Sequence, residues 1–404
     1  MDALDILTDL ENVLPFFQPI FSADEHQVIG YEVLGRYYDG SEYISLGPFF
    51  HDSSIPEEYR TEVDQVVLKK ALDRFLEVDE HLLIFINRDA DLLMKGADDP
   101  FLEVLHEYEE LGLKLNRYVL EISEANYQGE LDQLDHFLNY LKTLGIKIAI
   151  DKLGHESSHL DRIGQLSPNI LKVDLRALRS NRASQGFQDI LYSLSLLARK
   201  IGATLLFENI EMVYQLQFAW KNGGRYYQGF YLHKPAKDFV ERTILKDKLK
   251  EEFHRFIAYE KKRIETLHQI TESFQVRMQD LVSKYKKQEK YEEFLGSLTK
   301  ELDSIAFRLY ICDEDGFQVS PNLFKGNHEW ISQVEYMNKN WSWRPYFLEN
   351  IHKMRLEKKG ILSDVYSDIE IGDNVRTFSY PLSTKHYLFI DLSYAFLYDN
   401  DGLL

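Results

Sequence analysis

The chain has 404 residues, 44% of them hydrophobic, and a formal net charge of −19 at pH 7. This composition is typical of a folded protein, and the negative charge argues against long DNA or RNA as a partner, because their phosphates would be repelled. The only cysteine is Cys312, which excludes an internal disulfide and favours a reducing, cytoplasmic location. The sequence shows neither a basic, apolar leader nor an apolar run near the ~20 residues of a membrane span, so we expect no signal peptide and no membrane insertion.

Six short apolar segments rich in β-forming residues each end at a residue that can bind a metal or a proton. Segments of helical period lie between them, for example 63–75 and 131–144. Apolar strands that alternate with amphipathic helices indicate a buried parallel sheet, and their spacing over residues 28–230 predicts an α/β fold of the TIM-like (β/α)₈ barrel type. The six terminal residues are Glu32, Asn87, Glu121, Asp151, Asp174 and Glu208.

In such a barrel the carboxyl ends of the strands converge on one mouth, so these six side chains are expected to be neighbours. The alternative is that each strand simply ends where a polar residue begins. Carboxylates with one carboxamide favour Mg²⁺ or Mn²⁺ over zinc or copper, and such ions are typical of phosphate-ester hydrolysis. Lys172 lies on the same strand face as Asp174, where it would orient the attacking water or offset phosphoryl charge.

Eight short motifs occur along this part of the chain. They are Phe-Phe-Gln18-Pro-Ile-Phe, Tyr-Glu32-Val-Leu34-Gly-Arg36, the strand-final Asn87, Leu-Glu121-Ile-Ser-Glu124, Ile-Ala-Ile-Asp151, Leu-Lys172-Val-Asp174, Phe-Glu208-Asn-Ile-Glu211 and Tyr-Gln228-Gly-Phe-Tyr-Leu. In type and order they resemble the motifs of the EAL-domain phosphodiesterases of cyclic di-GMP, over about residues 10–236. Each motif is weak alone, but eight in register are specific.

The resemblance implies roles for the matched positions. The implied metal ligands are Glu32, Asn87, Glu121, Asp151 and Glu208, for Mg²⁺ or Mn²⁺, with Ca²⁺ also able to occupy the site. The implied catalytic residues are Lys172, Asp174 and Glu208. The implied contacts of cyclic di-GMP are Gln18, Glu32, Leu34, Arg36, Gln228 and Pro235, with Arg36 pairing with a phosphate. Glu124 would anchor the loop after its strand.

One segment departs from the family pattern. The family has a second aspartate after the one that matches Asp151, and it helps to hold the second metal; here Lys152 stands in its place and the following loop is one residue shorter. An ammonium cannot ligate a cation. We therefore expect weak or absent hydrolysis, with Lys152 placing a positive charge near the second-metal site. The alternative is that Lys152 points outward on the opposite face of the strand. Histidines of this loop, His155 and His159, are interpreted as exposed.

After Pro235 the composition and the hydrophobic pattern of the sequence change. Residues 237–290 are densely charged and carry one apolar stripe, which predicts a long helix or a helical hairpin that packs on its own domains or forms a two-chain coiled coil. Residues 291–404 contain alternating strands with Asp-Gly turns, typical of an antiparallel sheet. The expected domains are thus the barrel (1–236), a helical connector (237–290) and an α+β domain (291–404).

The last domain resembles PAS- or Cache-like sensor domains, and most closely that of YkuI-type EAL proteins. The resemblance is carried by Asn340-Trp-Ser-Trp-Arg-Pro-Tyr-Phe347 and Ser363-Asp-Val-Tyr-Ser-Asp368. It implies a pocket for a small-molecule ligand, although aromatic residues equally build the core of a small domain. The implied lining residues are Trp343, Arg344, Tyr346, Tyr366 and Asp391.

Three functions fit these observations. The first is a metal-dependent cyclic di-GMP binding protein with weak or absent hydrolysis, expected to be a homodimer by resemblance. The second is an active phosphodiesterase that produces pGpG and is tuned by the C-terminal domain. The third, from carboxylates alone, is a glycosidase that uses two acids such as Glu121 and Glu208. Lys172, Arg36 and the motif order argue against the third.

Overall fold

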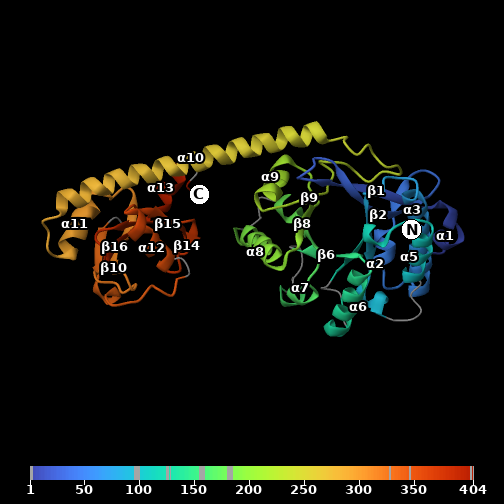
Figure 1. Cartoon of the computed structure of the whole chain (residues 1–404), viewed down its shortest axis with the longest axis horizontal. Helices are drawn as coiled ribbons and strands as arrows, with labels where there is room; N and C mark the ends of the chain where they lie inside the picture. Colours follow the sequence, from blue (N-terminus) through green and yellow to red (C-terminus); the bar gives the residue numbers. More distant parts are fainter. Residues whose placement is uncertain are drawn as a thin grey trace. The chain divides into compact units, whose positions relative to one another are not determined.

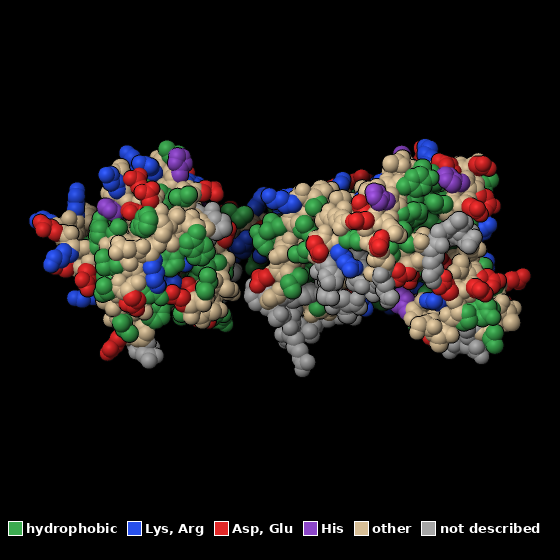
Figure 2. Space-filling view, turned by 90° about the horizontal axis from the view of Figure 1, so that it is seen from below, with side chains coloured by type: hydrophobic (Ala, Val, Ile, Leu, Met, Phe, Trp, Pro, Cys, Tyr) green, Lys and Arg blue, Asp and Glu red, His purple; other side chains and the backbone are tan. Residues whose placement is uncertain are grey.

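The computed structural model describes residues 3–94, 101–123, 127, 129–153, 160–179, 185–326, 329–344, 347–400 and 403. The chain divides into two compact units, Met1–His254 and Arg255–Leu404, which are drawn in Figure 1. No helix in these described ranges combines the length and the hydropathy that crossing a membrane requires. On the face shown in Figure 2, hydrophobic side chains lie among acidic and basic ones in both units.

The first unit is a closed eight-stranded barrel, as the sequence predicts. Seven neighbouring strands, from β2 through β9, run parallel, and β1 closes the barrel by pairing with both β2 and β9. Both pairings of β1 are antiparallel, which departs from a wholly parallel barrel. The barrel strands are β1 (Val13–Ser22), β2 (Val28–Tyr38), β4 (Leu83–Arg88), β5 (Tyr118–Ile122), β6 (Lys147–Leu153), β7 (Ile170–Asp174), β8 (Thr204–Glu208) and β9 (Tyr226–Tyr227), while β3 (Tyr43–Ser45) extends β2 at the edge.

Helices lie around the barrel (Figure 1); the first precedes β1, and the others lie between barrel strands along the chain. They are α1 (Ala3–Thr8), α2 (Gly47–His51), α3 (Glu57–Phe75), α4 (Ala90–Met94), α5 (Phe101–Glu110), α6 (Leu131–Thr143), α7 (Leu160–Leu166), α8 (Gln185–Ile201) and α9 (Val213–Lys221). One layer of buried side chains from six different strands fills the barrel interior, so the polar site stands above an apolar floor. The layer consists of Ile20, Phe85, Val119, Ala149, Ile170 and Leu206.

The charged segment after the barrel forms one long helix, α10 (Lys246–Tyr285), rather than a hairpin within the segment. Its first turns belong to the barrel unit, where Leu249 and Phe253 are buried. Its later turns belong to the second unit, where Met278 is part of the hydrophobic core. This 40-residue helix is therefore stabilised by packing near both of its ends, while its middle is strongly charged.

The second unit is built on an antiparallel sheet with the strand order β12-β11-β10-β16-β15-β13, and β14 pairs with β15. The strands are β10 (Ala306–Asp313), β11 (Asn322–Gly326), β12 (Glu329–Gln333), β13 (Ile361–Leu362), β14 (Tyr366–Ser367), β15 (Asn374–Pro381) and β16 (His386–Leu392). The helices α11 (Tyr291–Glu301), α12 (Phe347–Glu357) and α13 (Tyr394–Asp399) accompany them. The alternating pattern around residues 307–312, 375–380 and 387–391 predicts the three central strands.

Candidate functional site

Lys172 stands at the centre of a group of four carboxylates inside the barrel. Its Nζ lies 2.8 Å from Glu121 Oε2, 3.2 Å from Glu32 Oε2, 3.6 Å from Glu208 Oε2 and 3.7 Å from Asp151 Oδ1. The Lys172 side chain is fully buried, and a lone charge there would be very costly. One ammonium that faces four carboxylates therefore holds the site together electrostatically, and we call these five residues the carboxylate cluster.

Strand register brings the cluster to one level of the barrel. Asn87 on β4 pairs with Glu121 on β5, and Asp174 on β7 pairs with Glu208 on β8. Parallel strands in register place such residues at the same height, so the predicted convergence at the strand ends is what the structure shows. Lys172 sits two residues before Asp174 and points to the same face of β7.

Glu32 is the hydrogen-bonding hub of the site. Asn87 Nδ2 donates to its Oε1 at 2.7 Å, and Gln228 Nε2 donates to its Oε2 at 2.7 Å. Gln18 on β1 lies directly opposite Glu32 in the antiparallel pairing and is also buried. Burial alone would raise the pKa of Glu32, but Lys172 and the two amide donors outweigh it and lower that pKa, so Glu32 is held as a carboxylate.

Glu121 and Glu208 are less easily ionised than Glu32. Burial and the neighbouring Glu32 raise the pKa of Glu121 well above its ordinary value. Burial and Asp151 raise the pKa of Glu208 to about 8. Burial alone would lower the pKa of Lys172, but the carboxylates raise it well above the usual range, so Lys172 stays charged. The site thus carries more carboxyl groups than one ammonium can neutralise, which is a setting for a further cation.

The donor set fits a hard divalent cation. Glu121 Oε1, Asp151 Oδ1 and Gln228 Oε1 are buried oxygens without a hydrogen-bond donor among the described residues. Buried oxygens without donors are what a cation with oxygen ligands requires. As the side chains stand, no group of three or more acidic, histidine or cysteine residues in the described ranges is already arranged around a metal position. The four carboxylates of the cluster face Lys172 instead.

Arg176 is a neighbour of the site that the sequence reasoning missed. Its backbone N–H donates to Asp174 Oδ1 at 2.7 Å, and its Nε donates to Asp174 Oδ2 at 2.6 Å. Asp174 is fully buried, so this double contact fixes its carboxylate at the end of β7. The sequence offers one signal for this contact: Arg176 stands two residues after Asp174, and an aspartate side chain commonly accepts a hydrogen bond from the backbone N–H two residues later.

Three residues expected to contact cyclic di-GMP, Leu34, Arg36 and Pro235, lie on β2 and at the end of the barrel domain. Arg36 donates from one terminal nitrogen to the Gly35 carbonyl at 2.9 Å and to Ser45 Oγ at 3.3 Å. Leu34 faces Phe16 in the register with β1. Pro235 is half-buried next to Ala236, which pairs with Phe17 of β1.

Lys152 lies in an irregular part of β6. Its φ is +65°, and the register of β6 with β7 shifts between Ile150 and Leu153. Lys152 Nζ lies 3.5 Å from Nε2 of His51 on α2, a neighbour that the sequence did not indicate. Among the described residues, the ion pairs of the carboxylate cluster are all made with Lys172. Glu124 and the loop that contains His155 and His159 lie outside the described residues.

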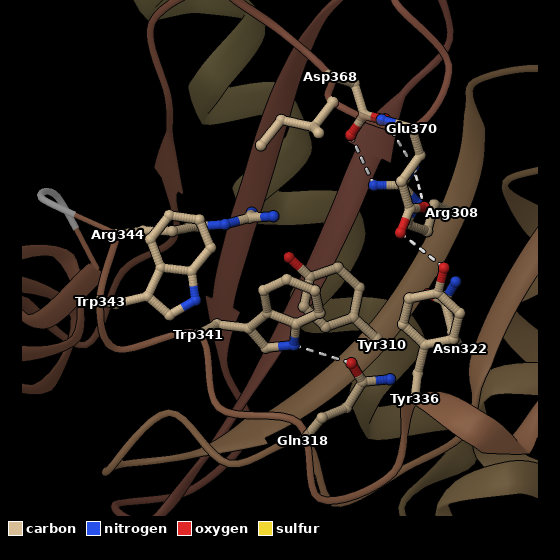
Figure 3. A pocket seen from close by; sticks show the side chains of 11 residues that line it. Arg308, Tyr310, Gln318, Asn322, Tyr336, Trp341, Trp343, Arg344, Asp368 and Glu370 are labelled. Atoms are coloured by element: carbon tan, nitrogen blue, oxygen red, sulfur yellow. Dashed lines mark hydrogen bonds and ion pairs between the residues drawn. The ribbon is translucent and has the colours of Figure 1, made fainter.

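The predicted pocket residues of the second unit separate into two groups. Trp343 and Arg344 line a cavity of about 220 Å³ (Figure 3). Tyr366 and Asp391 bond to Thr377 beside it, through Tyr366 Oη at 2.7 Å and Asp391 Oδ1 at 2.6 Å. Tyr346 lies outside the described residues.

Comparison with known protein families divides the chain into an N-terminal and a C-terminal domain. The family model described as "EAL domain" matches residues 2–235, and the model described as "EAL-domain associated signalling protein domain" matches residues 239–404. The EAL-domain containing protein YkuI of Bacillus subtilis (strain 168) is 55% identical over 406 residues, with 100% of both chains covered. The cyclic di-GMP phosphodiesterase NbdA of Pseudomonas aeruginosa is 28% identical over 54% of this chain and 28% of its own length.

Solved structures give the same result. The crystal structure of B. subtilis YkuI in complex with cyclic di-GMP and calcium matches with a TM-score of 0.96 at 54% identity, covering 100% of both chains. An EAL-domain protein of Listeria monocytogenes, 24% identical with a TM-score of 0.51 over 59% of this chain and 94% of its own, shares the barrel fold. With both family models matched and a full-length relative above half identity, the chain belongs to the EAL-domain family and carries the C-terminal domain of its YkuI-type members.

Proposed function

We propose that the chain is a metal-dependent cyclic di-GMP binding protein with weak or absent hydrolysis, which acts as a receptor or regulator. The observation that carries this proposal is the carboxylate cluster with Asn87 and Gln228 at its edge, because it combines a hard-cation donor set with amide groups. The crystal structure of the 54% identical YkuI with cyclic di-GMP and calcium supports the choice of ligand. Arg36 would pair with a phosphate, and Gln18, Leu34, Gln228 and Pro235 would contact the rest of the dinucleotide.

The metal would be held by oxygen ligands of the cluster. A bound divalent cation would neutralise phosphate charge and, in a hydrolytic site, lower the pKa of a water ligand. Mg²⁺ or Mn²⁺ is the proposed natural ion, and Ca²⁺ is a suitable binding probe. The proposed ligands are Glu32, Asn87, Glu121, Asp151 and Glu208.

Lys152 is the reason for proposing binding without efficient hydrolysis. It stands where the family pattern has an acid for the second metal, and its ammonium adds positive charge instead of a ligand. Its position beside His51 indicates that the bulge of β6 turns this side chain toward α2. In this arrangement Lys152 weakens the second-metal site by withholding a carboxylate, not by filling the site with its ammonium.

An active phosphodiesterase is the second candidate. The implied catalytic residues Lys172, Asp174 and Glu208 are all at the barrel mouth, and the relative NbdA is named a cyclic di-GMP phosphodiesterase. A glycosidase is not retained, because Lys172 contacts both Glu121 and Glu208 and would oppose their use as a separated acid and nucleophile.

Calorimetry with cyclic di-GMP in EDTA, in Ca²⁺ and in Mn²⁺ tests the proposal. We expect binding that divalent metal strengthens at least about tenfold, and loss of this metal effect in Glu121→Gln. Glu110→Gln, an exposed acid at the end of α5, is the matched control and should bind as the parent does. Chromatography then follows pGpG with Mn²⁺ present. Efficient turnover would favour the phosphodiesterase, and absence of any dinucleotide binding would reject both candidates.

Two further properties remain predictions, the first from the family and the second from the sequence. We expect a homodimer, which light scattering of the full chain would show as twice the mass of 47.6 kDa. The cytoplasmic location expected from the single cysteine is open to the same kind of direct test, by fractionation of cells that express the chain.

A further inference from the structure

The C-terminal unit contains a cavity that the cyclic di-GMP site does not use. It encloses about 220 Å³ between β10, the segment of residues 336–344 and the segment of residues 368–370 (Figure 3). A cavity of this size suits a metabolite smaller than a dinucleotide. Aromatic rings and charged side chains line it together.

One end of the cavity carries an excess of acid. Arg308 makes a double ion pair with Asp368, from its two terminal nitrogens at 2.7 and 3.0 Å. The same guanidinium lies 3.1 Å from Asp391 and 3.2 Å from Glu370. Burial raises the pKa of Asp391, but even with Asp391 protonated, Asp368 and Glu370 outnumber the single guanidinium. This end therefore favours an additional positive charge.

The other end presents a cation on aromatic rings. The Arg344 guanidinium carbon lies 4.6 Å from the ring centre of Trp341 and 5.8 Å from that of Trp343. Figure 3 shows this guanidinium projecting inward above Trp341 and Tyr310. The N–H edge of a guanidinium packed on an aromatic ring suits a carboxylate.

The aromatic walls are less suited to a plain organic cation. Arg344 already lies over Trp341, and Lys339 lies 3.5 Å from the ring centre of Tyr336. Tyr310 is stacked on Phe389 at 5.1 Å. These contacts cover one face of each ring, so we argue the choice of ligand from charge pairing and not from an aromatic cage.

A buried donor gives a second indication of a ligand. Arg308 is 6% exposed and lines the cavity, yet its Nε–H has no hydrogen-bond acceptor in the described part of the chain. Such a donor is costly unless an oxygen atom meets it. A ligand oxygen in the cavity would supply that acceptor.

We infer that this cavity binds a small zwitterion, a molecule that carries both an ammonium group and a carboxylate, as amino acids do. The ammonium pairs with Asp368 and Glu370, the carboxylate accepts hydrogen bonds from Arg344 and from Nε–H of Arg308, and the rest of the molecule fills the space between them. This site is separate from the barrel, so it stands whether or not cyclic di-GMP binds there.

Calorimetry on the full chain with each of the twenty standard L-amino acids at millimolar concentration tests the inference. We expect at least one to bind, and its N-acetyl and carboxamide derivatives to bind at least about tenfold more weakly, because each lacks one of the two charges. If none binds, or if both derivatives bind as well as the parent compound, the inference is overturned.

Substitution then assigns the binding to the cavity. Arg344→Gln should weaken binding of the selected amino acid about tenfold or more, and Glu370→Gln should weaken it as well. Arg355→Gln is the matched control, since Arg355 is an exposed arginine of the same unit that pairs with Glu314. Circular dichroism checks that each variant is folded. Unchanged binding in a folded Arg344→Gln variant would contradict the assignment.

Discussion

Lys172 shows what a single residue contributes to the site. One buried ammonium shares its charge among four carboxylates, so each acid is only partly compensated. Glu32 keeps a low pKa because two amides also donate to it, while among the described residues no amide donates to Glu208, which retains a proton more readily. The cluster therefore contains one acid held as a carboxylate, Glu32, and two whose raised pKa favours the protonated form, Glu121 and Glu208, from which a bound metal would displace the proton.

The raised pKa of Glu208 predicts how the metal-free protein responds to pH. Between its ordinary value of 4.5 and about 8, Glu208 is protonated in the folded state and ionised in the unfolded state. The folded state then binds more protons, so stability falls as pH rises through this window, by at most about 1.4 kcal/mol per pH unit for one proton. Urea unfolding in EDTA at pH 5, 6, 7 and 8 measures the slope.

The variant Glu208→Gln isolates this contribution. Its free energy of unfolding should depend on pH less steeply than that of the parent chain, by the equivalent of about one proton. Glu110→Gln should keep the slope of the parent chain. Equal slopes in the parent and in Glu208→Gln would show that the protonation of this residue is not linked to folding.

Lys152→Asp tests why hydrolysis is expected to be weak. The substitution restores the acid that the family pattern has at this position and removes an ammonium, so Mn²⁺-dependent formation of pGpG should rise at least about tenfold. Chromatography of the products at matched enzyme concentration measures the change. Lys152→Ala serves as the control, since it removes the charge without adding a ligand. If neither variant increases turnover, Lys152 is not what limits the reaction.

Much of the barrel site could be predicted at the level of single residues. Parallel strands must end on one side of a barrel, so the acids that terminate them are brought together by topology alone. The sequence did not predict contacts that depend on side-chain rotamers. These are the contacts of Lys172 with the carboxylates, of Arg176 with Asp174 and of Lys152 with His51.

At the scale of the element, one turn fixes Gln228 against Glu32. Gly229 follows Gln228 with a φ of +152°, and a Cβ built there would lie 2.1 Å from the Ile210 carbonyl oxygen and 2.3 Å from the Ile210 nitrogen. Gly229→Ala should therefore destabilise the barrel by several kcal/mol, on the order of 2–4. It should also weaken ligand binding, since Gln228 would shift with the turn. Denaturant unfolding and calorimetry measure the two effects.

Gly164 offers the matched control for that substitution. It lies in α7 with open space where a Cβ would be, so Gly164→Ala should be neutral or stabilise by about 0.5–1 kcal/mol. Similar losses of stability in both variants would mean that the Gly229 turn carries no special constraint.

Whole elements differ in how well sequence predicts them. The parallel strands are short apolar runs and are readily recognised, but β1 contains Pro15 and Pro19, which normally demote a run from strand to loop. Both prolines are accommodated in the antiparallel pairing with β2. The apolar stripe after the barrel likewise permits a helix or a hairpin. The structure decides for a single helix, Lys246–Tyr285, with Leu249 buried near one end and Met278 buried near the other.

At the scale of the whole molecule, two separate cores share one helix. The interior layer of the barrel contains Leu206, and the core of the second unit contains Leu298. Chains with more than one core commonly do not unfold in a single step. We therefore expect two transitions in scanning calorimetry of the full chain.

Two matched variants assign these transitions. Leu206→Ala and Leu298→Ala each remove a buried leucine side chain and should each cost about 2–5 kcal/mol, lowering one transition and leaving the other in place. Cyclic di-GMP with Ca²⁺ should raise only the transition that Leu206→Ala lowers, because a ligand stabilises the unit whose folded state binds it. A single transition that both variants lower equally would mean that α10 joins the two cores into one cooperative unit. Binding of the dinucleotide to the barrel would then stabilise the second unit as well.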